Sequence, residues 1–170
     1  MTDIEDIIKG TTLRESTVPL CLAGALQGEY EALEQQLADP AAQFGDSLAG
    51  SSRTAIASRM EELRAEMAEH LVEFRLRALP HEEWSSLLAA HPGGDGQAFD
   101  PATFGPAAVA ACAVNPAMTV DQYGRLAKKL SFGQQEALLD AVWQLNNQVA
   151  RAVPFSLLAS ATVAGRGGES

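Results

Sequence analysis

Between residues 70 and 104 the spacing of the apolar side chains changes twice, and proline or glycine accompanies each change. Over 72–77 apolar and charged residues alternate, which predicts a β-strand with one buried face. Over 80–90 the apolar positions follow helical spacing until a His-Pro-Gly-Gly sequence ends the pattern. Asp100-Pro101 supplies an N-cap and a first-turn proline for another helix. Because this segment organises no catalytic group, we expect a small packed scaffold that works by binding.

A second β-prone run, Thr17 to Leu22, lies far upstream of the strand predicted at 72–77. Pro19 cannot donate a hydrogen bond to a neighbouring strand, so we expect this run to be an edge or terminal strand. A single strand cannot satisfy its own backbone groups, and 72–77 is its natural partner. The pair would tie together the first half of the chain.

Two helices, each with one apolar stripe, are predicted between these strands. The first ends at Asp39-Pro40, and the second begins after Ser51 and Ser52, which can cap it. Since a single apolar stripe must be covered, the two helices predict a helical hairpin or a self-associating pair. The stripes are Leu26, Tyr30, Leu33 and Leu37 in the first helix, and Ile56, Met60, Leu63, Met67 and Leu71 in the second.

Short helices separated by explicit stops are predicted in the second half. One spans about 80–90, and another spans about 101–114 with a break at Gly105-Pro106. Thr119-x-x-Gln122 and Ser131-x-x-Gln134 match the capping box, so two more helices begin there. We expect the helices to bury Trp84 and Trp143 as core anchors, together with Tyr123, Leu126, Leu130, Leu138, Leu139, Val142, Leu145 and Val149.

The predicted fold is mainly α with a small two-stranded β element, built as a helical hairpin plus a bundle of short helices. Residues 1–78 would hold the N-terminal strand, the hairpin and the second strand, and residues 79–155 would hold the bundle. Residues 156–170 include a glycine-rich end with little apolar surface and are expected to form a flexible tail. A single compact unit is the alternative.

The formal net charge of −10 argues against nucleic acid as a partner, because that affinity comes largely from lysine and arginine. The net charge is −7 for residues 1–50, −4 for 51–100 and +1 for 101–170, so acidic groups gather in the first two-thirds. No apolar run approaches membrane-spanning length, and the N-terminus lacks a signal peptide's apolar core. Cys21 and Cys112 lie far apart in unlike contexts with no partner at metal spacing, so we expect both to be buried apolar residues in a reducing compartment. We expect a soluble intracellular protein.

Several motifs suggest chemistry, but each lacks a required partner. Gly45-Asp46-Ser47-Leu48 matches an esterase nucleophile block, yet no histidine follows His91 to take the proton. The glycines of 93–96 lack the Lys-Ser/Thr of a phosphate loop. The glutamates of 62–73 lack Glu-x-x-His pairs, and the three histidines share no ligand spacing. We therefore expect no enzymatic activity, no cofactor and no bound metal.

Short motifs follow one another along the chain in a definite order. They are Thr17–Leu22, Tyr30-x-x-Leu33, Phe74–Pro80, Glu83-Trp84-x-x-Leu87, His91-Pro92, Phe99-Asp100-Pro101-x-x-Phe104, Val114-Asn115-Pro116, Leu145-Asn146 and Val153–Ser156. Together they resemble the tail assembly chaperones of long-tailed bacteriophages, in particular those of actinobacterial hosts. The resemblance covers nearly the whole chain, although each motif is short.

The resemblance implies a non-enzymatic late protein that binds the tape measure protein, a long apolar helical polypeptide. Such chaperones keep that client soluble in the host cytoplasm, promote assembly of the tail tube around it, and are absent from the mature virion. The end of this chain resembles the shorter, non-frameshifted product. The frameshifted longer form and the major tail tube protein are further implied partners, and we expect a homo-oligomer with no nucleic acid and no membrane as partners.

The contact residues of that family are not marked by motifs that can be transferred to single positions here. Since methionine adapts to varied apolar partners, our candidate protein-binding surface is Ile56, Met60, Leu63 and Met67, as a client groove or a self-association face. Packing of this stripe against the 26–37 helix is the alternative. The alternative function is a structural virion component such as a small head-tail connector protein.

Overall fold

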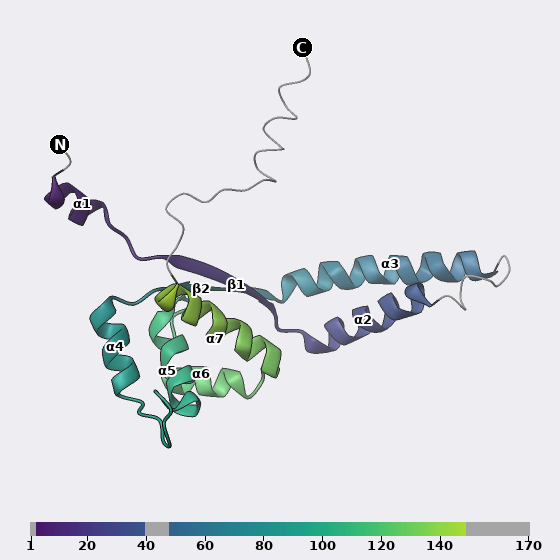
Figure 1. Ribbon diagram of the computed structural model, residues 1–170. Coiled ribbons are helices and arrows are strands. Elements are labelled where there is room, and N and C mark those ends of the chain that lie inside the picture. The colour runs from purple at the N-terminus through teal and green to yellow at the C-terminus, as the bar shows by residue number, and fades with distance from the viewer. Residues whose placement is uncertain (1–2, 40–47, 149–170) are drawn as a thin grey trace, which may run out of the picture.

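The computed structural model describes residues 3–39 and 48–148, and within them it is mainly helical with a small antiparallel sheet (Figure 1). The expectations for Gly45–Ser47, for Val149 and for 153–170 lie outside the described residues. The elements in chain order are α1 (Ile4–Gly10), β1 (Glu15–Cys21), α2 (Gly24–Ala38), α3 (Leu48–Glu69), β2 (Leu71–Arg77), α4 (His81–Ala89), α5 (Pro101–Cys112), β3 (Ala113–Asn115), α6 (Val120–Ala127) and α7 (Phe132–Asn147).

The three strands form one sheet in the order β1-β2-β3, and both pairs are antiparallel. β1 and β2 pair from Glu15 opposite Arg77 to Cys21 opposite Leu71, which confirms the predicted partners. The prediction of two strands is incomplete, because Ala113–Asn115 forms β3 against β2. A strand of three residues that directly follows a helix has too little alternation to be recognised from sequence.

Pro19 lies on the edge strand, as predicted. Ala78 N donates to Arg14 O at 2.9 Å and Leu22 N donates to His70 O at 3.1 Å, so the even-numbered residues of β1 face β2 in the ladder. Alternate residues of an edge strand turn their backbone groups outward, and Pro19 is one of these. The proline therefore costs no ladder hydrogen bond, and it removes a donor from the free edge.

Helices α4–α7 gather on one side of the sheet (Figure 1) and enclose the main core with it. Phe74 and Leu76 of β2 are 2% and 0% exposed, and they cluster with buried residues from all four helices. We call β1–β3 with α4–α7 the lobe; its core joins parts that were assigned to 1–78 and 79–155. The core residues are Leu20, Phe74, Leu76, Ala78, Trp84, Phe104, Ala108, Val109, Cys112, Tyr123, Leu130, Leu138, Val142 and Leu145.

Helix starts that depend on local caps are confirmed. The side chains of Thr119 and Ser131 accept hydrogen bonds from the backbone N–H groups of Gln122 and Gln134, whose own side chains complete both capping boxes. Asp100 caps α5 through its side chain, which accepts a hydrogen bond from Ala102 N–H, with proline in the first turn. These starts are encoded within four residues, so the sequence alone is sufficient to predict them.

Two expectations about helices are wrong, and one helix is additional. No break occurs at Gly105-Pro106, because residues on both sides are buried and their packing outweighs the hydrogen bond that proline cannot make. Ser51 and Ser52 do not cap α3, which begins at Leu48 and contains them. The additional helix is α1, whose cap is the Asp3 side chain.

Helices α2 and α3 form the predicted hairpin, which projects away from the lobe (Figure 1). Leu22-Ala23 joins β1 to α2, and His70 joins α3 to β2. No residue of α2 is buried, and neither helix contributes to the core of the lobe. The hairpin is therefore an arm that is held mainly by its own two helices.

Candidate functional site

The stripe predicted to bind a partner lies on α3, within the hairpin. Leu63 is fully buried, whereas Ile56, Met60 and Met67 are half-buried. The stripe of α2, from Leu26 to Leu37, is also half-buried, which indicates that the two stripes face each other. This arrangement favours the packing alternative for Leu63, because a side chain without exposed surface cannot contact a client while the hairpin is closed.

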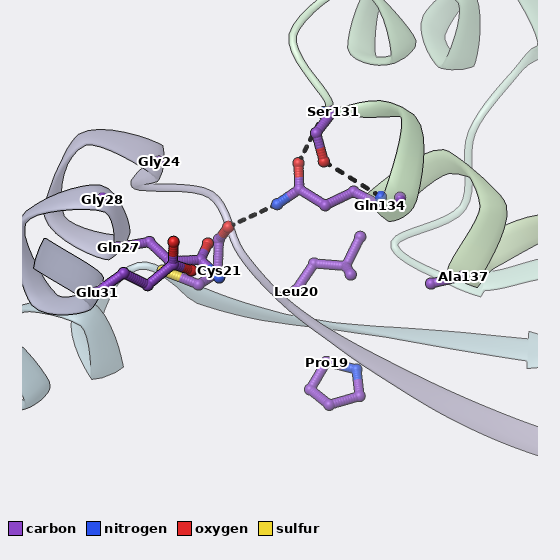
Figure 2. A pocket seen from close by; sticks show the side chains of 11 residues that line it. Pro19, Leu20, Cys21, Gly24, Gln27, Gly28, Glu31, Ser131, Gln134 and Ala137 are labelled. Carbon is purple, nitrogen blue, oxygen red and sulfur yellow. Dashed lines mark hydrogen bonds between the residues drawn. The ribbon is translucent and has the colours of Figure 1, made fainter. Parts of the chain in front are cut away.

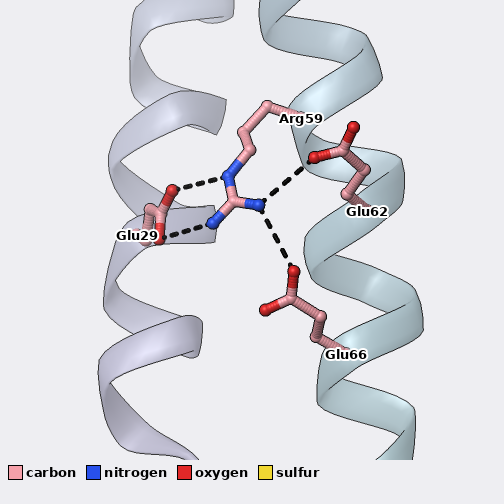
Figure 3. Close-up of polar contacts among 4 residues, drawn as sticks. All are labelled: Glu29, Arg59, Glu62 and Glu66. Carbon is pink, nitrogen blue, oxygen red and sulfur yellow. Dashed lines mark hydrogen bonds and ion pairs between the residues drawn. The ribbon is translucent and has the colours of Figure 1, made fainter.

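An arginine joins the two helices of the hairpin (Figure 3). Arg59 Nε of α3 lies 2.8 Å from Glu29 Oε1 of α2, and its guanidinium also reaches Glu62 and Glu66 at 3.3 Å each. The hydrogen bond from Arg59 lowers the pKa of Glu29, and the same contact raises the pKa of Arg59. The network is exposed, so it orients the two helices more than it stabilises them.

A pocket of about 530 Å³ lies where the base of the hairpin meets α7 (Figure 2). Gln134 bridges its two sides: Nε2 donates to Cys21 O at 2.9 Å, while Oε1 accepts from Ser131 N at 2.9 Å. Gly24 and Gly28 leave the α2 wall open. Because Gln134 also caps α7, the pocket marks the joint between hairpin and lobe rather than a set of converging reactive groups.

Four aromatic rings meet where α4, α5 and α7 come together. Ring centroids lie 5.4 Å apart for Trp84 and Phe104, 4.7 Å for Phe99 and Phe104, and 5.6 Å for Phe99 and Trp143. Trp84 is 6% exposed, which confirms it as a core anchor. Trp143 is 39% exposed, so its prediction as a core anchor is wrong. Val142 takes the core position, and the next residue is turned by about 100° toward solvent.

Beside Trp143 the rings border a cleft of about 340 Å³ between α5 and α7, which we call the aromatic cleft. Glu136 and Asp140 also line it, and neither forms an ion pair with any described residue. Burial and, secondarily, the charge of Glu136 raise the pKa of Tyr123. The residues lining the cleft are Phe99, Pro101, Phe104, Gly105, Glu136, Leu139, Asp140 and Trp143.

Asn146 makes the polar connection at the other end of α7. Its Oδ1 accepts from Leu79 N at 2.8 Å, and its Nδ2 donates to Val142 O at 2.8 Å and contacts Cys112 Sγ at 3.5 Å. Burial raises the pKa of the Cys112 thiol, against the opposing hydrogen bond from Asn146. The contacts fix the end of α7 to the segment between β2 and α4.

The motifs that were set aside form no reactive cluster in the described part of the chain. No three His, Cys, Asp or Glu side chains of the described residues are placed to hold a metal ion. The glycines of 93–96 serve a turn: a Cβ on Gly93 would lie 2.6 Å from Gln97 O, and Gly96 has a φ of 84°. Within 3–39 and 48–148 no helix combines the length and apolar character that crossing a bilayer requires.

The comparisons with known proteins add no relative. A scan against models of protein families found no match, and neither did searches among curated proteins and among solved structures. The functional assignment therefore depends on the sequence motifs and on the geometry described above.

Sequence reasoning missed the aromatic cleft, although part of its signal was present. Phe132, Leu139 and Trp143 follow one another at steps of seven and four along α7, beside the core stripe. A helix with apolar residues on two neighbouring faces is either buried on both or leaves one for another partner. Phe132 at 78% exposed shows that α7 leaves apolar surface open.

Proposed function

We propose that the protein is a tail assembly chaperone of a long-tailed bacteriophage, which binds the tape measure protein, keeps it soluble and promotes tail tube assembly around it. The proposal assigns it a non-enzymatic role in the host cell cytoplasm and no place in the mature virion. It includes self-association, and contacts with the frameshifted longer form and the major tail tube protein.

The observation that carries the proposal is the convergence of the resemblance motifs. Phe74 and Leu76 of one motif, Trp84 of a second, Phe104 of a third and Leu145 of a fourth all belong to the core of the lobe. Residues that lie up to 71 positions apart thus form one packed unit. That these motif residues pack against one another supports treating the motifs as parts of one folded unit.

The surface of the lobe also suits a client that is a long amphipathic helix. Such helices bind by laying an apolar face into an apolar groove. The aromatic cleft and the exposed ring of Phe132 lie on α5 and α7, on the same part of the lobe. The hairpin stripe is the less accessible surface, since Leu63 is fully buried within the arm.

Co-expression with the tape measure protein encoded downstream tests the proposal. We expect the soluble fraction of the full-length client to rise, and the two proteins to purify together. An unchanged soluble fraction would contradict the chaperone function. The matched control replaces this chain with its F104A variant, which has almost the same composition but a destabilised lobe, so a smaller rise in soluble client is expected.

Mass spectrometry of purified phage particles separates the chaperone from the connector alternative. A chaperone that leaves before the virion is complete should be absent from particles that contain the tube and tape measure proteins. A connector would be present in purified particles at a fixed number of copies per particle, and that result would contradict the proposed function.

A further inference from the structure

We propose that the aromatic cleft binds an amphipathic helix in which an apolar side chain is flanked by lysine or arginine residues one turn apart. That this helix belongs to the tape measure protein rests on the proposed function. The charge and apolar pattern expected of the bound helix follow from the residues that line the cleft.

Charge gives the first argument. Residues 101–170 hold only four acidic side chains, and two of them, Glu136 and Asp140, line this cleft. Neither carboxylate has a cationic partner among the described residues, and Glu136 is half-buried. Two unpaired carboxylates beside apolar surface favour a ligand that brings positive charge with it.

The rings give the second argument. Trp143 and Phe99 both retain exposed surface at the cleft, and their centroids lie 5.6 Å apart. A lysine or arginine side chain packs its apolar stem on such rings while its charged end reaches a carboxylate. The cleft therefore matches a cation on an apolar stem better than a purely apolar ligand.

Spacing gives the third argument, for a helical ligand. Glu136 and Asp140 are four residues apart on α7, so they lie on one face and about one turn apart. Cations four residues apart on a partner helix have the same separation and would face both carboxylates. A cleft between two helices can receive a third helix along its length.

The first experiment uses a synthetic peptide of about 20 residues, long enough to be helical, with a leucine stripe and lysines four residues apart. NMR would follow the indole N–H of Trp143, with backbone N–H groups of the hairpin helices α2 and α3 as the internal reference. We expect the Trp143 signal to shift and binding to weaken with salt. A peptide with glutamate in place of each lysine should not bind. Equal binding of both peptides, or no shift of Trp143, overturns the proposal.

Two variants locate the binding site. E136K/D140K reverses both carboxylates at the surface of α7, and we expect peptide affinity to fall about tenfold through lost attraction and new repulsion. E31K/E34K makes the same charge change on the hairpin and should leave affinity unchanged. A loss that is equal in both variants would show a general charge effect and overturn the assignment to the cleft.

Gly105→Ala tests the cleft without a change of charge. A Cβ on Gly105 would meet only the methyl groups of Leu139, at 3.7 and 3.8 Å, so the fold accommodates it. Alanine also favours the helix. We expect G105A to be at least as stable as the parent chain but to bind the peptide several-fold more weakly, because the new methyl fills the cleft floor. Unchanged affinity would overturn the proposal.

Parallel assays distinguish the failure of the cleft from the failure of the chaperone function. If the parent chain and E136K/D140K solubilise the tape measure protein equally, the client binds elsewhere and the cleft assignment falls. If peptide binding shifts Trp143 but the parent chain does not solubilise the client, the cleft stands and the chaperone function falls. A Trp143 signal that depends on protein concentration alone would assign the cleft to a second copy and overturn the proposal.

Discussion

The lobe and the hairpin bury their apolar residues by different means. In the lobe, four helices and a sheet enclose side chains such as Phe104, Leu76 and Leu138, each at most 1% exposed. In the hairpin, Leu63 is fully buried, whereas Ile56, Met60 and Met67 are half-buried, and Leu71, predicted to continue this stripe, is exposed and begins β2. The lobe has layers on several sides of its core, whereas the hairpin helices pack mainly against each other.

This difference in burial predicts that the lobe is the more stable region and that the hairpin opens more easily. Apolar area that is completely removed from water contributes most to the free energy of folding, so the lobe should unfold last. The hairpin makes fewer such contacts and should open at a lower free energy than the lobe. Regions that open at low cost are the ones from which moving or binding elements are drawn.

The largest effect is expected from the core of the lobe. Phe104→Ala should lower the free energy of unfolding by about 3–5 kcal/mol, since it leaves a cavity among packed rings. Urea denaturation followed by circular dichroism measures the change. The matched control is Phe132→Ala, where the ring is 78% exposed. An equally large loss in the control would contradict burial of the Phe104 ring as the source of the effect.

A smaller and local effect is expected from Leu63→Ala. We predict a loss of about 2–3 kcal/mol that is confined to the hairpin, because Leu63 lies outside the core of the lobe and α2 packs against α3. Amide hydrogen exchange should increase along α2 and α3 and remain unchanged in α7. Alkylation of Cys21, at the hairpin base, should accelerate while buried Cys112 stays protected. Faster labelling of Cys112 would show that hairpin and lobe unfold together. Leu13→Ala, at an exposed leucine outside both regions, is the control.

Asn146→Ala tests the polar contact that holds the end of α7. The change leaves the Leu79 N–H without its acceptor, so we expect a loss of about 1–2 kcal/mol from the lobe. Differential scanning calorimetry would report it as a lower melting temperature. Asn147→Ala removes an exposed amide next to it and should leave the melting temperature almost unchanged.

The smallest effect is expected from Arg59→Gln, and it should depend on pH. Arg59 lowers the pKa of Glu29 in the folded protein, so their interaction is present above the ordinary carboxyl range and is lost as pH falls through the folded value. The variant should therefore be less stable than the parent chain at pH 7, and the difference should shrink as pH falls below the ordinary carboxyl range and Glu29 becomes protonated. Arg64→Gln, whose partner Glu61 lies on the same helix, should not change the pairing of α2 with α3. A pH-independent difference for Arg59→Gln would contradict the role of Glu29.

Local rules in the sequence were sufficient for a large part of the fold. The capping boxes at Thr119 and Ser131 involve residues three positions apart. Pro19 predicts an edge strand because proline has no N–H to donate to a second neighbour. The pairing of β1 with β2 was also predictable, because few segments could complete either strand. The caps and the edge position depend on what a residue does to the nearby backbone, whereas the pairing depends on how few strands are available.

Features that depend on three-dimensional neighbours were not predictable. The continuity of α5 through Pro106 depends on burial against the rest of the lobe, and β3 depends on the position of β2. The apolar stripe that contains Met60 predicted that this face of α3 packs against another surface. It did not predict how much of each side chain stays exposed. The exposure of Trp143 depends on how the first turns of α5 pack beside α7, which no periodicity in either helix specifies.

The hairpin grows directly out of the two longest strands, with two residues on one side and one on the other. The ladder even continues one pair into these connectors, through Leu22 and His70. The sheet thus sets the direction in which the hairpin projects, while the core of the lobe contains no residue of the hairpin helices. One turn added to each helix would extend it by about 5.4 Å without disturbing the lobe. The length of the hairpin can therefore change during evolution in steps of one helical turn, while the packing of the lobe stays the same.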